Sequence, residues 1–284
     1  VAFFTLINVI GSKVSGSIQL FLVVFVLTVM VWFLSEGLFE TQKQGIEKSN
    51  LDPFFTQGFS GFVSVIGLVF VSYGGLTKVA SAAEEVDDPS LKIPLGMSLS
   101  LFTATVLYTL GALVAVALLP PDLLHEDLAP IHSAAESVLP SAGVALVVLA
   151  ALAAFASAVN AGILAAARYP MAMARDGLLP EIAGRLSRYG TPAFGVIATG
   201  VAIALVVLLL DAESIAKLAS AFVLLTLGLL NIAVLVLRAS HIRSYAPAFK
   251  APFYPLTQFA GIAISIFLIS QLHQPQLYHD HQNQ

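Results

Sequence analysis

The chain has 284 residues, of which 58% are hydrophobic and 11% charged, and its formal net charge is −4. Soluble domains carry roughly 25% charged residues, so this composition excludes a soluble protein and indicates an integral membrane protein. No basic block accompanies the negative net charge, so we expect no nucleic-acid partner. Cysteine is absent, which excludes disulfides, thiol catalysis and cysteine-ligated metals.

Hydrophobic runs cover most of the chain, which predicts one polytopic transmembrane domain over residues 1–284 embedded in the lipid bilayer. The opening residues, VAFFTLINVIG, have the composition of a helix already under way, so we expect the chain to be N-terminally incomplete. About seven further spans follow, each near the ~20 residues that a bilayer crossing needs. They are expected at 17–34, 59–94 (interrupted), 95–119, 143–167, 193–210, 215–237 and 255–272. We also expect a polar loop at 36–52 and a frayed polar tail at 273–284.

The apolar helix expected from Phe59 is interrupted at Ser72-Tyr73-Gly74-Gly75. Two adjacent glycines inside a helix are costly and favour an opened backbone. Inside a bilayer, an opened backbone is tolerated only where it is buried in protein or lines a cavity. The freed groups could bind a small zwitterionic ligand, and the helix resuming near Leu76 would point its positive end at a carboxylate. The alternative is a glycine kink that serves only helix packing.

Lysine and arginine are concentrated in alternate loops. One set of loops holds ten of the 13, namely Lys13, Lys78, Lys92, Arg168, Arg175, Arg185, Arg188, Arg238, Arg243 and Lys250. The other set holds Lys43, Lys48 and Lys217. By the positive-inside rule the first set is cytoplasmic, so we expect the loops at 84–94, 168–192 and 238–254 to face the cytoplasm.

Asn160 is a polar residue inside the apolar span at 143–167. An amide at that depth costs free energy unless it finds a partner. Asn160 is therefore either an interhelical hydrogen-bonding residue or a contact to a ligand or to opened backbone, and the sequence leaves both alternatives open.

Acidic residues, among them Glu84 and Glu85, crowd the end of the resumed half-helix, where they oppose its dipole. Arg168 and Arg175 are basic partners on the same predicted side, and Asp176 directly follows Arg175. A cytoplasmic ion-pair gate and ordinary solvated loop charges both fit this pattern.

Enzyme motifs give no consistent site. Gly58-Phe59-Ser60-Gly61 matches the GxSG of intramembrane serine proteases, but these need a histidine in another membrane helix, and all six histidines lie outside the predicted spans. HExxH, paired intramembrane aspartates and a P-loop are all absent from the sequence. We expect no catalytic residue, no metal site and no enzyme activity.

Two long motifs resemble amino acid permeases of the amino acid–polyamine–organocation (APC) superfamily. FVSYGGLTKVASAAEEVDDPSLKIPLG is similar to their sixth helix, which reads approximately F-x-[YF]-x-G-[FL]…A-E-E-V-x-x-P-x-x-x-I-P. SAVNAGILAAARYPMAMARDGLLP is similar to their eighth helix and following loop, N…R-x-x-x-A-M-A-R-D-G-x-L-P. Asn8-Val-Ile-Gly11-Ser-Lys13, followed by Gln19, resembles the entry to helix five. The resemblance covers essentially the whole chain as helices five to eleven, preceded by the end of helix four.

The resemblance implies an all-α, inverted-repeat fold shared with sodium-coupled neurotransmitter transporters, in which broken helices one and six bind substrate at the membrane midplane. It implies secondary active transport of amino acids across the plasma membrane, by alternating access around the break at 71–76. The residues that would line the amino acid site are Val71, Ser72, Tyr73, Gly74, Gly75, Leu76 and Asn160. The residues that would form the cytoplasmic gate are Glu84, Glu85, Arg168, Arg175 and Asp176.

The chain departs from the family pattern in two respects. Helices one to three are not in it, so the other half of the substrate site would have to come from N-terminal helices supplied elsewhere. Some relatives carry a lysine in helix five and others a hydroxyl in helix eight, but residues 20–30 hold no ionisable group and residues 161–167 no hydroxyl. We therefore expect no cofactor, and the sequence supports neither sodium nor proton coupling, so it does not identify the coupling ion.

Two alternatives accompany this interpretation. A polyamine or organic-cation permease is disfavoured, because the predicted cavity helices offer no acid to pair with a second ammonium. The other alternative is a truncated membrane fragment with a structural role and no transport activity.

Overall fold

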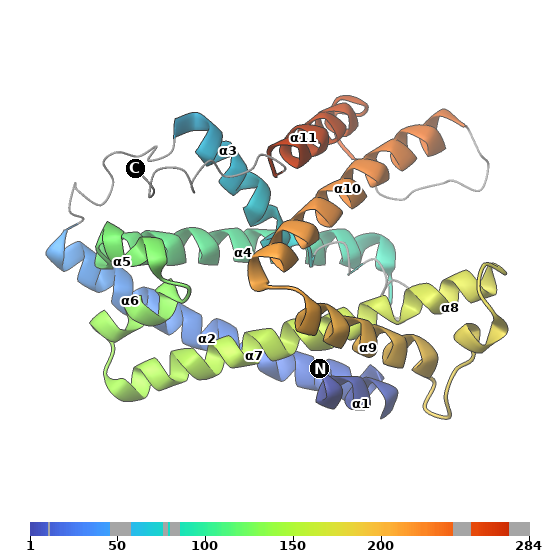
Figure 1. Ribbon diagram of the computed structural model, residues 1–284, viewed down its shortest axis with the longest axis horizontal. Coiled ribbons are helices and arrows are strands. Elements are labelled where there is room, and N and C mark those ends of the chain that lie inside the picture. Colours follow the sequence, from blue (N-terminus) through green and yellow to red (C-terminus); the bar gives the residue numbers. More distant parts are fainter. Residues whose placement is uncertain (11, 46–57, 76–78, 80–85, 241–250, 273–284) are drawn as a thin grey trace. The chain divides into compact units, whose positions relative to one another are not determined.

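The computed structural model describes residues 1–10, 12–45, 58–75, 79, 86–240 and 251–272. All regular elements among these residues are helices (Figure 1). The chain divides into two compact units, one comprising Val1–Pro53 and Ser98–Leu208, the other Phe54–Met97 and Leu209–Gln284. Each unit is described by itself, and the expectation of one domain stays a prediction.

Four described helical segments are long and apolar enough to cross a membrane. They are α2 (Ser12–Gln44), α4 (Pro89–Leu118), α7 (Ser141–Ala166) together with the short helix that follows it, and α10 (Ala212–Ala239). Two shorter apolar helices, α9 (Ala193–Leu209) and α11 (Leu256–Leu272), lie near the minimum span length. The protein is an all-α integral membrane protein with several membrane-spanning helices.

In the first unit, α2 runs alongside α7, as Figure 1 shows in blue and yellow-green. Their shared core includes Phe33 of α2 and Val147 and Ala150 of α7, together with Val114 of α4. Small residues allow the helices to approach closely here, since a Cβ added to Gly143 of α7 would collide with the Trp32 ring. The core of this unit is therefore built on the α2–α7 pair.

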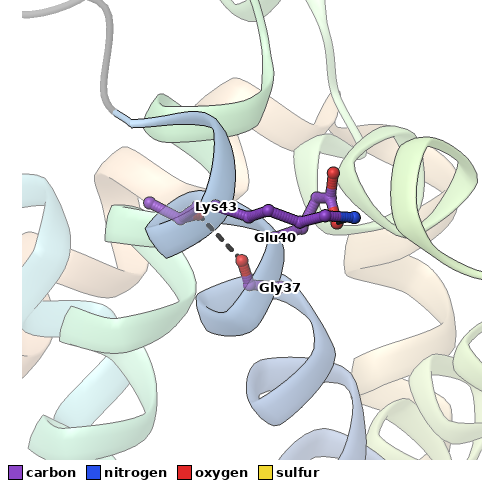
Figure 2. A network of polar contacts seen from close by, with 4 residues as sticks. Gly37, Glu40 and Lys43 are labelled. Carbon is purple, nitrogen blue, oxygen red and sulfur yellow. Dashed lines mark hydrogen bonds and ion pairs between the residues drawn. The ribbon is translucent and has the colours of Figure 1, made fainter.

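The polar loop expected from residue 36 is wrong over residues 36–44, because α2 continues to Gln44. Gly37 and Thr41, one turn apart, are buried on the face that continues the apolar stripe, and Gly37 packs directly against Val114. Glu40 and Lys43 form an ion pair of 3.6 Å on the last turns (Figure 2). Packing of one face therefore extends the helix through a stretch whose composition is polar.

The connection between α4 and α7 contains two short helices, α5 (Pro121–Glu126) and α6 (Pro130–Val138). Asp127 precedes α6, and its Oδ1 accepts a hydrogen bond of 2.7 Å from the Ala129 amide. Hydrogen bonds from the Ser133 side chain and the Ala129 amide, with the nearby His132, hold the pKa of Asp127 below its usual value. Asp127 therefore stabilises the start of α6 as a carboxylate.

α9 is attached to the rest of the first unit through the turn that precedes it and through two glycines. The Thr191 hydroxyl donates a 2.8 Å hydrogen bond to the Val9 carbonyl at the end of α1 (Ala2–Ile10). A Cβ at Gly195 would overlap the Ala167 carbonyl oxygen, and one at Gly200 would overlap the Thr5 side chain. Side-chain-free positions therefore let α9 contact both α1 and the end of α7.

The second unit contains α3 (Gly58–Val69), the 3₁₀ helix η2 (Phe70–Tyr73), α10 and α11. α10 and α11 lie side by side (Figure 1). Val63 of α3, Leu224 of α10 and Leu268 of α11 form its core. α4 begins in this unit and crosses to the first at residue 98. Pro89 is its first residue, where a missing N–H costs nothing.

Candidate functional site

The helix break lies where the glycines predict it. The α-helical part of the segment ends at Val69, the backbone tightens into the 3₁₀ helix Phe70–Tyr73, and a turn follows at Gly74 and Gly75. A break beginning at Ser72 predicts a helix that ends at Val71, and the α-helix ends two residues earlier, at Val69. A 3₁₀ turn is frequent at the end of an α-helix and marks a hinge when it lies within a longer helix; residues 76–78 and 80–85, where the helix is expected to resume, lie outside the described residues.

The break is held in place by the helices of its own unit. Phe70 packs against the cluster formed by Val63, Leu224 and Leu268, and η2 contacts α10. Ser72 is exposed beyond this contact, whereas Tyr73 and Gly74 are half-buried. Val71 belongs to η2 through its backbone, and Leu76 lies outside the described residues. The 3₁₀ turn is therefore anchored at Phe70, exposed at Ser72 and half-buried again at Tyr73.

Gly75 has open space beside it. A Cβ added there would meet no atom within 4 Å among the described residues, and Gly75 itself is exposed. Packing within the described structure therefore does not explain the glycine. Its φ lies outside the left-handed region, so the observed backbone conformation does not require glycine either. The remaining physical reasons for it are freedom to change conformation or close approach by something outside the described residues.

Asn160 is fully buried and hydrogen bonded to two other helices of the first unit. Its Oδ1 accepts a 2.8 Å hydrogen bond from Nδ2 of Asn8 on α1. Its Nδ2 donates a 3.2 Å hydrogen bond to Oε1 of Gln19 on α2. Gln19 in turn donates from Nε2 to Oγ of Ser157 on α7, at 2.6 Å. These contacts favour the interhelical alternative for Asn160, although its place in a substrate site stays a prediction.

Sequence reasoning did not predict that Asn160 pairs with Asn8 and Gln19. Asn8 and Gln19 are amides within apolar helices, the same signal that singled out Asn160, but their pairing depends on the fold. Asn8 and Asn160 are 152 positions apart. Buried amides in membrane helices form hydrogen bonds with one another because lipid hydrocarbon provides no hydrogen-bonding groups.

The predicted cytoplasmic gate is described only in part. Arg168 begins the helix α8 (Arg168–Arg175), and Arg175 ends it, with its Nη2 3.9 Å from Sδ of Met171. Asp176 is the residue after the helix, and its backbone N–H donates to the Ala172 carbonyl at 3.1 Å. The chain continues through the 3₁₀ helix η4 (Glu181–Gly184). Glu84 and Glu85 lie outside the described residues, so the ion pairs of the gate stay a prediction.

The two parts of the predicted substrate site belong to different units. The break at 71–75 is in the second unit and Asn160 is in the first. Each part has a defined local structure, and their combination into one site stays a prediction.

Comparison with known proteins identifies the family. A sequence model of the amino acid permease family matches residues 1–277. The chain is 36% identical over 186 residues to the cationic amino acid transporter 2, vacuolar, of Arabidopsis thaliana, covering 65% of this chain and 29% of the relative. It is 28% identical over 278 residues to the branched-chain amino acid permease BcaP of Lactococcus lactis subsp. cremoris, covering 94% and 59%. It is 27% identical over 263 residues to the methylthioribose transporter of Bacillus subtilis, covering 92% and 56%.

The chain therefore spans between 29% and 59% of the length of these relatives. The family and the names of the relatives are those of transporters rather than enzymes. The match over nearly the whole chain confirms the resemblance given by the motifs around the helix break and after Asn160. This chain belongs to the amino acid permease family.

Proposed function

We propose that this chain takes part in secondary active transport of amino acids, by alternating access around the broken helix at residues 71–76. The observation that carries the proposal is the change from α-helix to 3₁₀ helix to a glycine turn inside an apolar segment. In transporters with inverted repeats, interrupted helices of this kind supply the backbone groups that bind substrate.

The chemistry of the break suits the groups that all amino acids share. The described residues from Phe70 to Gly75 hold no ionisable acid or base apart from the Tyr73 phenol. Backbone carbonyls freed by the break can accept hydrogen bonds from an ammonium, and freed amides can donate to a carboxylate. Recognition by backbone would fix the α-amino and α-carboxyl groups, and other residues would select the side chain.

Amino acids are the substrate class that the relatives favour. Two of the relatives above are named for cationic and branched-chain amino acids, and the third for methylthioribose. The absence of acidic residues from 70–75 gives no support to a polyamine, which would need a partner for its second ammonium.

The remaining parts of the proposal concern the gate and orientation. Glu84, Glu85, Arg168, Arg175 and Asp176 would form ion pairs that close the cytoplasmic side. The distribution of lysine and arginine supports cytoplasmic loops at 84–94, 168–192 and 238–254. We place the protein in the plasma membrane, and N-terminal helices outside this chain would complete the substrate site.

Uptake into proteoliposomes tests the proposed function. The protein, expressed with any flanking sequence that its gene encodes, is given a panel of labelled amino acids, a polyamine and methylthioribose. A pH gradient and a sodium gradient are imposed separately, and empty liposomes are the control. We expect saturable uptake of at least one amino acid. Uptake of another solute, with every amino acid excluded, would overturn the proposal.

A further inference from the structure

Four side chains in the first unit form one directed chain of hydrogen bonds across α1, α2 and α7. Asn8 donates to Asn160, Asn160 donates to Gln19, and Gln19 donates to Ser157, at 2.8, 3.2 and 2.6 Å. We refer to these residues as the amide chain. Asn8 and Asn160 are fully buried, and Gln19 is half-buried.

The direction of the amide chain is set by one backbone carbonyl. Nδ2 of Asn8 also donates to the Phe4 carbonyl at 2.8 Å, and a carbonyl can only accept. The NH₂ of Asn8 is thereby fixed, and it must face the oxygen of Asn160. The NH₂ of Asn160 then faces the oxygen of Gln19, and that of Gln19 faces Ser157. Each amide therefore has one favourable orientation.

Apolar packing elsewhere along α2 and α7 does not supply this precision. Phe33, Val147 and Ala150 pack by non-directional contacts, whereas hydrogen bonds weaken steeply when donor and acceptor are misaligned. The amide chain thus fixes the rotation and axial register of α1 and α2 relative to α7.

We propose that Gln19 is a positioning residue for transport. Its hydrogen bonds to Asn160 and Ser157 hold α2 in register with α7. This register determines the rate of the transport step and has little effect on the affinity for substrate. The inference rests on the proposed function, because alternating access moves packed helices as units, and a change in register shifts the balance between the two open states.

Two variants, Gln19→Leu and Gln19→Glu, test whether the hydrogen bonds of Gln19 affect transport. Leucine removes both hydrogen bonds at similar size. A protonated glutamic acid accepts from Asn160 and donates from its O–H to Ser157, so it reproduces the pattern of glutamine. An ionised glutamate can accept from both Asn160 and the Ser157 hydroxyl, but it carries a charge that burial disfavours. Neither α1 nor α7 contains an Asp, Glu, Lys, Arg or His residue, and the nearest on α2 is Lys13, six positions away.

Initial rates of uptake are measured against substrate concentration for both variants, with Thr28→Val as the matched control. Thr28 is an exposed residue of α2 whose hydroxyl bonds only to the Val24 carbonyl among the contacts seen. We expect Gln19→Leu to lower Vmax about tenfold and leave KM within about twofold. The rate of Gln19→Glu, divided by that of the wild type at the same pH, should rise as the pH falls. Thr28→Val should behave as wild type.

Three outcomes would overturn the inference. Wild-type Vmax in Gln19→Leu would show that the amide chain does not affect transport. A raised KM with unchanged Vmax would place Gln19 in contact with substrate. A Gln19→Glu ratio that is independent of pH would show that a negative charge within the amide chain does not disturb the helix register that transport needs.

A second readout separates this inference from the proposed function. The melting temperatures of Asn8→Leu, Gln19→Leu and the double variant are measured in detergent without substrate. Residues in one network are non-additive, so the double variant should lose less than the sum of the single losses. If the wild type transports no amino acid, the proposed function and the effect on rate both fail, while non-additivity still supports the amide chain as the register-setting contact. Additive losses would reject the chain itself.

Discussion

Asn160 in the first unit reaches across to Asn8 on α1 and Gln19 on α2, whereas Asn231 in the second unit donates to the Leu227 carbonyl of its own helix α10. Close glycine contacts differ in the same way. A methyl group at Gly195 in the first unit would meet the backbone of Ala167, but one at Gly261 in the second would meet the Asn231 side chain. Gly195 thus faces backbone that cannot move without displacing a helix, whereas Gly261 faces a side chain that can rotate.

This difference suits the proposed roles of the two parts. The described portion of the first unit holds the directed hydrogen bonds between α1, α2 and α7, and the second unit holds the segment that we propose to be the helix break. A transporter that works by alternating access needs both a rigid framework and a segment that rearranges. The following predictions test the comparison, starting with the largest effect.

Filling the space beside Gly75 should abolish transport. Gly75→Leu adds a side chain at the turn and removes the backbone freedom of glycine, so we expect uptake to fall by about 100-fold or more, with membrane insertion unchanged. Gly16→Leu, at an exposed glycine of α2 with equally open space, is the control. Wild-type uptake in Gly75→Leu would show that the glycines serve helix packing and that the break has no role in transport.

Adding a methyl group to Gly195 should destabilise the first unit. The methyl would overlap the Ala167 carbonyl oxygen, which cannot move without displacing the end of α7. We expect a loss of about 2–3 kcal/mol in the free energy of unfolding, measured in mixed micelles. Gly16→Ala, which meets nothing within 4 Å, should be neutral or slightly stabilising. Equal behaviour of the two variants would contradict the close approach of α9.

The equivalent change in the second unit should cost less. Gly261→Ala places its methyl against the amide of Asn231, a side chain that can rotate away after losing its bond to Leu227. We expect a loss of about 1 kcal/mol by the same measurement. If Gly261→Ala and Gly195→Ala lowered the free energy of unfolding equally, a methyl group against a side chain would cost as much as one against backbone, which would contradict the comparison.

The smallest effect is expected at Asp127. Its pKa is lowered in the folded protein by the Ser133 and Ala129 hydrogen bonds, so its stabilising effect is present above the ordinary aspartate pKa. That effect is lost as the pH falls through the lowered value. The melting temperature of Asp127→Asn should therefore lie slightly below that of the wild type at neutral pH and converge with it on acidification. A difference that does not change with pH would contradict this role.

Hydropathy located most of the helices because a membrane span depends on local composition. The span expected at 143–167 is α7 at Ser141–Ala166, and that expected at 193–210 is α9 at Ala193–Leu209. The break was located by Gly74 and Gly75, whose backbone preference is also local.

Features that depend on tertiary contacts were not predicted. α2 extends to Gln44 because Gly37 and Thr41 pack against the first unit. α4 begins at Pro89 rather than 95, although its first residues are exposed; this start agrees with a local signal, since proline favours the first position of a helix. The sequence identified Asn160 but could not choose its partners, since Asn8 and Gln19 come next to it only through folding.

The hydroxyl of Thr191 has a consequence for membrane topology. Its single proton goes to the Val9 carbonyl, so in its 2.8 Å contact with Ser187 the serine must be the donor. The hydrogen bonds from Ser187 to Thr191 and from Thr191 to Val9 hold the turn that contains Arg188 against the end of α1. Arg188 belongs to the positive charges that we propose to orient the chain during insertion. These two hydrogen bonds would then keep the Arg188 charge at a constant depth relative to the membrane after insertion is complete.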